Sequence, residues 1–211
     1  MVRKKRRVQM RFNNHSRLKI GGFANFKFTW QTRMLQKYIT PSSKLLDLGC
    51  AAGKLSRLIP DKYNYYGVDY NEDFEVFGKK NNLKIRCYDI SKERLPFEDN
   101  TFDIVWFRHV IEHLQVKEQF FVMKEILRVL KPGGKVFVFA PTPYHWFFWD
   151  NDTHVRPCTH GQLEHLAKDL GFSKAVGKYS LLRKYSGTVQ RMARVTPLRW
   201  FLWETFLEAT K

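Results

Sequence analysis

The ten residues from Lys44 to Gly53 restrict the fold of this chain most strongly, and they read Lys-Leu-Leu-Asp-Leu-Gly-Cys-Ala-Ala-Gly. The apolar start with its aspartate predicts a short strand, and the small residues predict a loop where the backbone approaches a ligand closely. Apolar residues with helical spacing follow at positions 55, 58 and 59, so a helix is expected after the loop. Open α/β sheets bind ligands at such a junction of a strand end with a helix N-terminus.

The spacing within this loop indicates the chemistry of the ligand. In a dinucleotide fingerprint the last glycine comes about five residues after the first, and the acidic residue comes later. Here Gly49, Ala51 and Gly53 stand at alternate positions, and Asp47 comes two residues before the first of them. An acid just ahead of the loop suits a cationic ligand better than a pyrophosphate. The segment resembles the first motif of class I S-adenosylmethionine-dependent methyltransferases, in which a carboxylate and a tight loop receive the methionine end of the cofactor.

Two further acids follow predicted strands. A second strand is predicted over residues 63–69 and ends at Asp69, and Asp89 follows a third predicted strand over residues 83–88. An acid at the end of the second strand is placed to accept hydrogen bonds from both ribose hydroxyls of a nucleoside. The alternative is a cap for the helix that follows. In the methyltransferase pattern, the acid after the third strand bonds the adenine amino group, and the next apolar residue, Ile90, covers the ring.

Two more segments resemble the same family. Residues 95–114 contain a Leu-Pro-Phe turn, a Phe-Asp pair that opens a fourth strand, and Glu-His-Leu in a predicted helix, while Leu-Lys-Pro-Gly-Gly at 130–134 precedes a fifth strand over Val136–Ala140. The resemblance covers about residues 40–172 and implies S-adenosylmethionine as the cofactor. The cofactor contacts that it implies are Asp47, Gly49, Cys50, Ala51, Gly53, Asp69, Tyr70, Asp89, Ile90 and Arg108.

A His-x-x-Glu-His set follows the fourth predicted strand. A helix would place His109, Glu112 and His113 on one face, where the three side chains could hold a divalent ion. Ubiquinone-pathway O-methyltransferases, which this region resembles, have a glutamate where this chain has His109. The other interpretation is that His113 packs or caps and that Glu112 is solvated. His109 is also a candidate base, helped by Glu112, because an unperturbed imidazole titrates near pH 6.5.

The segment 141–158 is the most aromatic part of the chain. Its aromatic cluster after a strand end is a candidate substrate platform, and the alternatives are a lid on the core or a membrane-interface patch. The motif Asp-Thr-His-Val-Arg-Pro that follows, at residues 152–157, resembles a segment of methyltransferases that act on glycans and lipid-linked sugars. There the histidine points toward the acceptor, so the resemblance implies His154 as a second candidate base.

The net charge of +17 is concentrated in the two flanks of the chain. Residues 1–46 contain 12 lysines or arginines and no acid, and residues 168–211 contain 9 basic and 3 acidic residues. The flanks are either solvated faces or sites for an anionic partner, such as a phosphorylated acceptor, RNA or a lipid surface. The three cysteines, Cys50, Cys87 and Cys158, have neither CxxC spacing nor a disulfide framework, which argues against zinc. The absence of a membrane-spanning run or a secretory signal predicts a soluble cytoplasmic protein.

The expected fold is α/β, a single Rossmann-like doubly wound sheet of seven strands that is mostly parallel with one antiparallel strand near the C-terminus. The chain would consist of a basic flexible arm over 1–25 and one domain over 26–211. A helix is predicted over 159–170, and the last two strands over about 172–179 and 203–209; an amphipathic membrane-surface helix over 198–207 is the alternative.

The predicted function is methyl transfer from S-adenosylmethionine to a hydroxyl group of a small, glycosylated or phosphorylated acceptor. An RNA methyltransferase is the first alternative, because the basic flanks could follow phosphates. Against it, the Asn/Asp-Pro-Pro-Tyr/Phe tetrapeptide typical of base-amine methylation is absent after the fourth strand. A non-catalytic subunit that binds the cofactor or activates a partner is the second alternative.

Overall fold

The computed structural model describes residues 30–180, 189, 192, 195–197 and 202–211. The predicted arm over 1–25 lies outside these ranges. So do four basic residues between the last two predicted strands, Arg183, Lys184, Arg191 and Arg194. Within the described part, no helix is both long and apolar enough to cross a bilayer.

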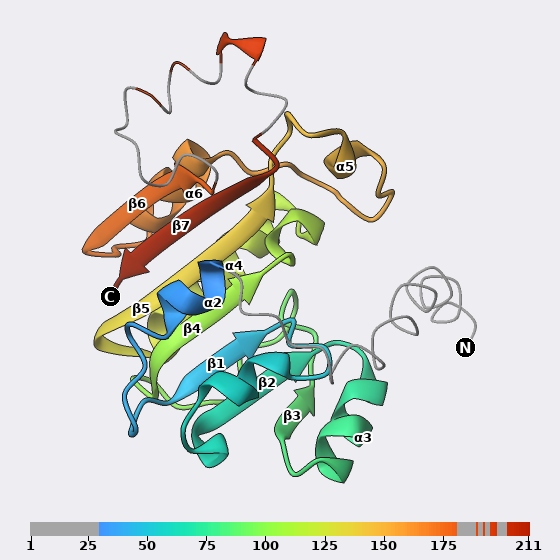
Figure 1. The fold of residues 1–211 in the computed structure, drawn as a ribbon, viewed down its shortest axis with the longest axis vertical. Coiled ribbons are helices and arrows are strands. Elements are labelled where there is room, and N and C mark those ends of the chain that lie inside the picture. Colours follow the sequence, from blue (N-terminus) through green and yellow to red (C-terminus); the bar gives the residue numbers. More distant parts are fainter. Residues whose placement is uncertain (1–29, 181–188, 190–191, 193–194, 198–201) are drawn as a thin grey trace.

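A single seven-stranded sheet forms the centre of the molecule, in the order β3-β2-β1-β4-β5-β7-β6 (Figure 1). The strands are β1 (Leu45–Leu48), β2 (Tyr65–Asp69), β3 (Lys84–Cys87), β4 (Phe102–Arg108), β5 (Leu130–Pro141), β6 (Lys174–Tyr179) and β7 (Glu204–Thr210). The neighbouring strands from β3 to β5 pair in parallel, and β7 is antiparallel to both β5 and β6. The prediction of one antiparallel strand near the C-terminus is therefore confirmed, and so is a strand in place of a membrane-surface helix at 204–207.

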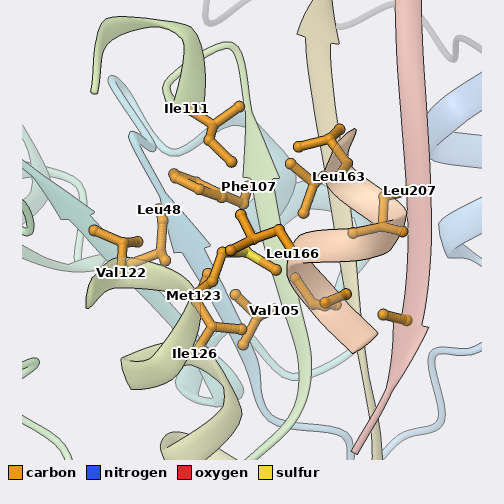
Figure 2. Close-up of a cluster of buried hydrophobic side chains, with 14 of the residues drawn as sticks. Leu48, Val105, Phe107, Ile111, Val122, Met123, Ile126, Leu163, Leu166 and Leu207 are labelled. Carbon is orange, nitrogen blue, oxygen red and sulfur yellow. The ribbon is translucent and has the colours of Figure 1, made fainter. Parts of the chain in front are cut away.

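Helices cover both faces of the sheet. They are α2 (Trp30–Leu35), α3 (Glu72–Lys80), α4 (Val116–Val129), α5 (Trp146–Trp149) and α6 (His160–Asp169), with 3₁₀ helices η2 (Lys54–Leu58), η3 (Lys62–Asn64) and η4 (Ile111–His113). Buried residues of α2, η2 and α3 pack with one face of the sheet, and buried residues of α4 and α6 pack with the other. Figure 2 shows the second cluster, where Met123 and Ile126 of α4 and Leu166 of α6 meet Val105 and Phe107 of β4. The sheet is thus doubly wound, as predicted.

Local sequence explains several helix ends. The Thr159 hydroxyl caps α6 by accepting a hydrogen bond from the backbone amide of Gln162. The side-chain oxygen of Gln162 accepts in turn from the backbone amide of Thr159, and the two bonds form a capping box. Asn71 caps α3 in the simpler way, by accepting from the Asp73 amide. These caps place the loops after β2 and before α6 at fixed positions.

The structure differs from the predicted elements at three points. The helix after Gly53 is a five-residue 3₁₀ helix, η2, although its predicted apolar positions are buried. The fifth strand begins at Leu130, before the predicted Val136, because Leu130 already pairs with Phe102 of β4, and the pairing resumes after a register shift at Lys135 and Ile104. The helical geometry predicted for His109 to His113 is wrong: His109 has the left-handed φ of 54°, and only Ile111–His113 form a 3₁₀ turn.

Strand order decides where a site can form. The order reverses between β1 and β4, and open α/β sheets bind ligands at such a point, beside the carboxyl ends of the strands. The loop after β1 and the residues after Arg108 both start at this point.

Candidate active site

The loop after β1 turns sharply at alternate residues. Gly49, Ala51 and Gly53 have φ values of 73°, 47° and 67°, the left-handed region that glycine adopts most easily. A Cβ atom at Gly49 would come 2.2 Å from Cγ2 of Val110, so the loop packs tightly against the turn after β4. The three small residues that the sequence singled out are thus the three residues of this loop that adopt the left-handed conformation.

Two acidic residues, Asp47 and Asp69, lie on the strands beside this loop. Asp47 is buried and accepts a hydrogen bond of 2.8 Å from the Tyr65 hydroxyl. Asp69 accepts from the backbone amides of Ala51 at 2.9 Å and Asn71 at 3.1 Å. Burial raises the pKa of Asp47 to about 7, against the lowering effect of the Tyr65 hydrogen bond, and burial also raises the pKa of Asp69. Asp69 therefore helps to hold the loop in shape through Ala51, a role that the sequence did not predict, whereas Asp47 is tied to Tyr65 of β2.

The third acid lies closer to solvent. Asp89 accepts from the Ser91 amide and hydroxyl through one oxygen and pairs with Lys92 through the other. Burial opposes ionisation, but the bonds from Lys92 and Ser91 outweigh it and lower the pKa of Asp89. Tyr70, after β2, is 54% exposed. Asp47 is the last but one residue of β1, Asp69 ends β2, and Asp89 follows β3, so these three predicted cofactor residues lie at the carboxyl ends of three adjacent strands.

A network of charged side chains with two buried carboxyl groups lies at the end of β4. His109 has Nδ1 at 3.5 Å from Oε1 of Glu112 and Nε2 at 3.3 Å from Oε1 of Glu204. Arg108 lies 3.7 Å from the same Glu204 oxygen. Burial opposes the charge on His109, but the two carboxylates prevail and raise its pKa. Burial likewise opposes ionisation of Glu204, whereas His109 and Ser180 lower its pKa. The raised pKa of His109 favours its protonated form between the two carboxyl groups.

Two further histidines, His113 and His154, lie near Glu112. The rings of His113 and His154 have centroids 4.9 Å apart, and Nε2 of His154 lies 3.9 Å from Oε1 of Glu112. Burial lowers the pKa of His154. Ligand atoms of Glu112, His113 and His154 all lie within 4.8 Å of one another. The structure therefore groups two of the three predicted metal ligands with His154, whereas His109 faces the two carboxylates.

The aromatic segment divides into a packed and an exposed part. Phe148 is buried and lies 5.0 Å from the His154 ring, while Trp149 is 67% exposed. The substrate platform and the lid thus remain alternative interpretations of this segment.

Sequence reasoning missed Glu204 and Tyr65. Glu204 is fully buried and also accepts from Gln31 at 3.0 Å and Ser180 at 2.7 Å. An acidic residue next to the apolar residues of the last strand was the only feature of the sequence that could have indicated Glu204. Its partners lie far away in the sequence. Tyr65 resembled any aromatic strand residue.

The topology and the site together define the class of protein. A methyltransferase from Archaeoglobus fulgidus, described as S-adenosylmethionine-dependent, has this fold, with a TM-score of 0.66, 21% identity, and coverage of 86% of this chain and 91% of its own. More particularly, residues 46–138 match the family described as a methyltransferase domain. The chain therefore has the fold of a methyltransferase described as S-adenosylmethionine-dependent, and its residues 46–138 resemble a methyltransferase domain.

Known relatives within this class differ in acceptor. The sterol 4-C-methyltransferase strm-1 of Caenorhabditis elegans is 34% identical over 124 residues, which are 54% of this chain and 36% of that protein. The demethylmenaquinone methyltransferase of Bacillus mycoides is 33% identical over 114 residues, 46% of this chain and 44% of the relative. The chain spans less than half the length of these two relatives. Phosphoethanolamine N-methyltransferase 2 of Haemonchus contortus, solved in complex with S-adenosyl-L-methionine, has a TM-score of 0.64 at 20% identity, covering 86% of this chain and 52% of its own.

Proposed function

We propose that this protein transfers the methyl group of S-adenosylmethionine to a hydroxyl group of a small acceptor, such as a sugar, a glycan or a phosphorylated molecule. The observation that carries the proposal is the tight loop after β1, whose Ala51 amide donates to Asp69 at the end of the neighbouring strand β2. When bound, the cofactor supplies a methyl group on a positively charged sulfur. The residues of this chain bind it, orient it and handle the acceptor.

The site residues fit the parts of this cofactor. A buried carboxyl with a pKa near 7, as Asp47 has, ionises readily once a cation approaches, which suits the amino group of the methionine end. Each carboxylate oxygen can accept two hydrogen bonds, so Asp69 can keep its loop contacts and still accept from ribose hydroxyls. Asp89 would exchange its partner Lys92 for the adenine amino group, and Ile90 would cover the ring.

The acceptor side is formed by the residues after β4. A hydroxyl must lose its proton when it attacks the methyl group, so a neighbouring group has to activate it. His109 suits this task poorly, because both of its nitrogens face carboxylates. His154 has a lowered pKa and lies beside Glu112 and His113. We assign hydroxyl activation to Glu112, His113 and His154, with His109 as a fixed positive charge beside them.

Cofactor binding is tested by calorimetry with S-adenosylmethionine. Asp69→Asn keeps the size of the side chain and one carbonyl oxygen but removes an acceptor, so we expect affinity to fall about tenfold or more. Asp73→Asn is the matched control, because Asp73 is exposed on α3, and it should bind as the wild type does. Equal affinity of the wild type and Asp69→Asn would contradict the proposed ribose contact.

The acceptor is tested by incubating the wild type with labelled S-adenosylmethionine and cell extract, followed by separation of small-molecule, lipid, RNA and protein fractions. We expect label in the small-molecule or glycan fraction. Label in RNA would replace this proposal with the RNA alternative. Cofactor binding without label in any fraction would support a non-catalytic subunit instead.

A further inference from the structure

Glu112, His113 and His154 form a compact cluster that the chain holds together through its backbone. The Glu112 carbonyl accepts hydrogen bonds from the amides of Val155 at 2.9 Å and Arg156 at 3.1 Å. These bonds fix the segment after His154 against η4, which carries the other two members. The positions of the three side chains therefore follow from the fold and do not depend on a ligand.

Both histidines are oriented by backbone carbonyls. Nδ1 of His113 lies 3.0 Å from the Thr153 carbonyl, and Nδ1 of His154 lies 2.9 Å from the Phe148 carbonyl. A carbonyl oxygen can only accept, so both Nδ1 atoms carry hydrogen, and the lone pair of each neutral ring is on Nε2. Metal-binding histidines are oriented in the same way, with one ring nitrogen donating to a carbonyl and the other facing the ion.

One carboxyl oxygen of Glu112, Oε2, is buried and could bind a cation. Its side chain is 1% exposed, and Oε1 faces His109. Oε2 is buried and has no hydrogen-bond partner among the residues that the structure describes. A buried carboxylate oxygen without a donor is costly, and a cation in the cluster would remove that cost.

We propose that Glu112, His113 and His154 bind one divalent first-row transition-metal ion, with Zn²⁺ as the test case. Two imidazoles and one carboxylate suit such ions better than Mg²⁺ or Ca²⁺, which prefer oxygen ligands alone. Cysteine spacing argued against zinc, but that argument covers thiolate sites only. Binding at His154 displaces Asn151, whose Nδ2 lies 3.2 Å from Nε2 of the ring.

The site also specifies how the acceptor is activated, a step that rests on the proposed function. Three protein ligands leave an open coordination position, which an acceptor hydroxyl can occupy. Binding to the ion lowers the pKa of the hydroxyl, and its proton passes to water. The oxygen then forms a bond to the methyl carbon while the carbon–sulfur bond breaks and leaves its electron pair on sulfur. The acceptor should therefore carry a hydroxyl that can reach both the ion and the methyl group.

The first experiment measures Zn²⁺ binding by calorimetry, with protein freed of metal by a chelator and Mg²⁺ titrated in parallel. We expect one Zn²⁺ per chain and no comparable binding of Mg²⁺. Glu112→Gln, His113→Ala and His154→Gln should each weaken Zn²⁺ at least about tenfold. His165→Ala, which removes an exposed histidine of α6, should leave the affinity unchanged. Circular-dichroism melting without metal checks that each variant is folded.

The second experiment needs no variant. In ¹⁵N-labelled wild type, Zn²⁺ should shift the Nε2 resonances of His113 and His154 most strongly, while their Nδ1 atoms stay protonated. Absence of stoichiometric Zn²⁺ binding, unchanged affinity in all three variants, or shifts at other histidines only would overturn the metal site.

A cofactor titration in the same samples separates the two proposals. Binding of S-adenosylmethionine without a Zn²⁺ site refutes the metal inference alone. A Zn²⁺ site in a protein that binds no S-adenosylmethionine refutes the proposed function alone and leaves the metal site standing.

Discussion

At the scale of single residues, Asp47 should make stability depend on pH. Burial raises its pKa in the folded protein to about 7, whereas an unfolded aspartate titrates near about 3.9. The folded state thus holds a proton that the unfolded state releases. The stability associated with this proton is complete below about pH 4 and is lost as the pH rises through about 7. From about pH 5 to pH 8, this group alone should lower the unfolding free energy by on the order of 3 kcal/mol.

Asp47→Asn isolates this effect because an amide does not ionise and can still accept from Tyr65. Urea denaturation of both proteins at about pH 5 and pH 8 should show that the variant gains stability relative to the wild type at the higher pH. Other titrating groups affect both proteins alike, so the difference between the two profiles reports Asp47. Parallel profiles would mean that the carboxyl has an ordinary pKa.

At the scale of elements, β7 connects the end of the chain with the site. Its first residue, Glu204, is fully buried and contacts α2 through Gln31, the end of β6 through Ser180, and the end of β4 through His109. Removing one partner of a buried ionic network leaves uncompensated charge. Glu204→Ala should therefore lower the unfolding free energy by about 3–5 kcal/mol.

Glu208→Ala is the matched control on the same strand. Glu208 is 28% exposed and pairs with Lys135 at 2.9 Å, and such partly solvated pairs contribute about 1 kcal/mol or less. Urea titrations of the two variants should differ by several kcal/mol. Similar losses in both would show that the Glu204 network contributes no more than an ordinary surface pair.

The elements themselves were largely predictable from the sequence, because periodicity and terminators act locally. Strands such as Lys174–Tyr179 and the helix His160–Asp169 lie within a few residues of their expected bounds. The 3₁₀ geometry of η2 and η4 was not predicted, and neither was the close packing of Gly49 against Val110, because this contact joins different segments of the chain. Glu204 was missed for the same reason, since its partner Gln31 lies 173 residues away.

The sequence predicted the cofactor side of the candidate site better than the acceptor side. The cofactor side depends on one contiguous loop and on the acids that end or follow three strands, so spacing alone brings Asp47, Asp69 and Asp89 together. The acceptor side combines η4 with the segment after α5, and no local pattern links Glu112 with His154. Only the order of the strands and the packing of the loops bring them together.

At the scale of the whole molecule, the sheet consists of a cofactor half, β3-β2-β1-β4, and a C-terminal half, β5-β7-β6. The question is whether the cofactor half can fold alone. β7 pairs with β5 from Lys135 to Pro141 and with β6 from Lys174 to Tyr179, so β6 joins the sheet only through β7. Phe206 and Leu207 of β7 also lie in the cores on opposite faces.

Deletion of residues 204–211 should therefore abolish folding of the entire sheet and not only of its edge. β5 would lose its backbone hydrogen bonds with β7, and the apolar residues of both cores would be exposed to solvent. His109 would also lose its contact with the carboxyl group of Glu204. We expect no cooperative unfolding transition by circular dichroism and no binding of S-adenosylmethionine. Lys211→Ala removes only the contacts of Nζ with Asn100 and Arg128, so this control should stay within about 1 kcal/mol of the wild type. A truncated chain that unfolds cooperatively and binds the cofactor would show that β3-β2-β1-β4 is an autonomous unit, and that β7 serves the acceptor side alone.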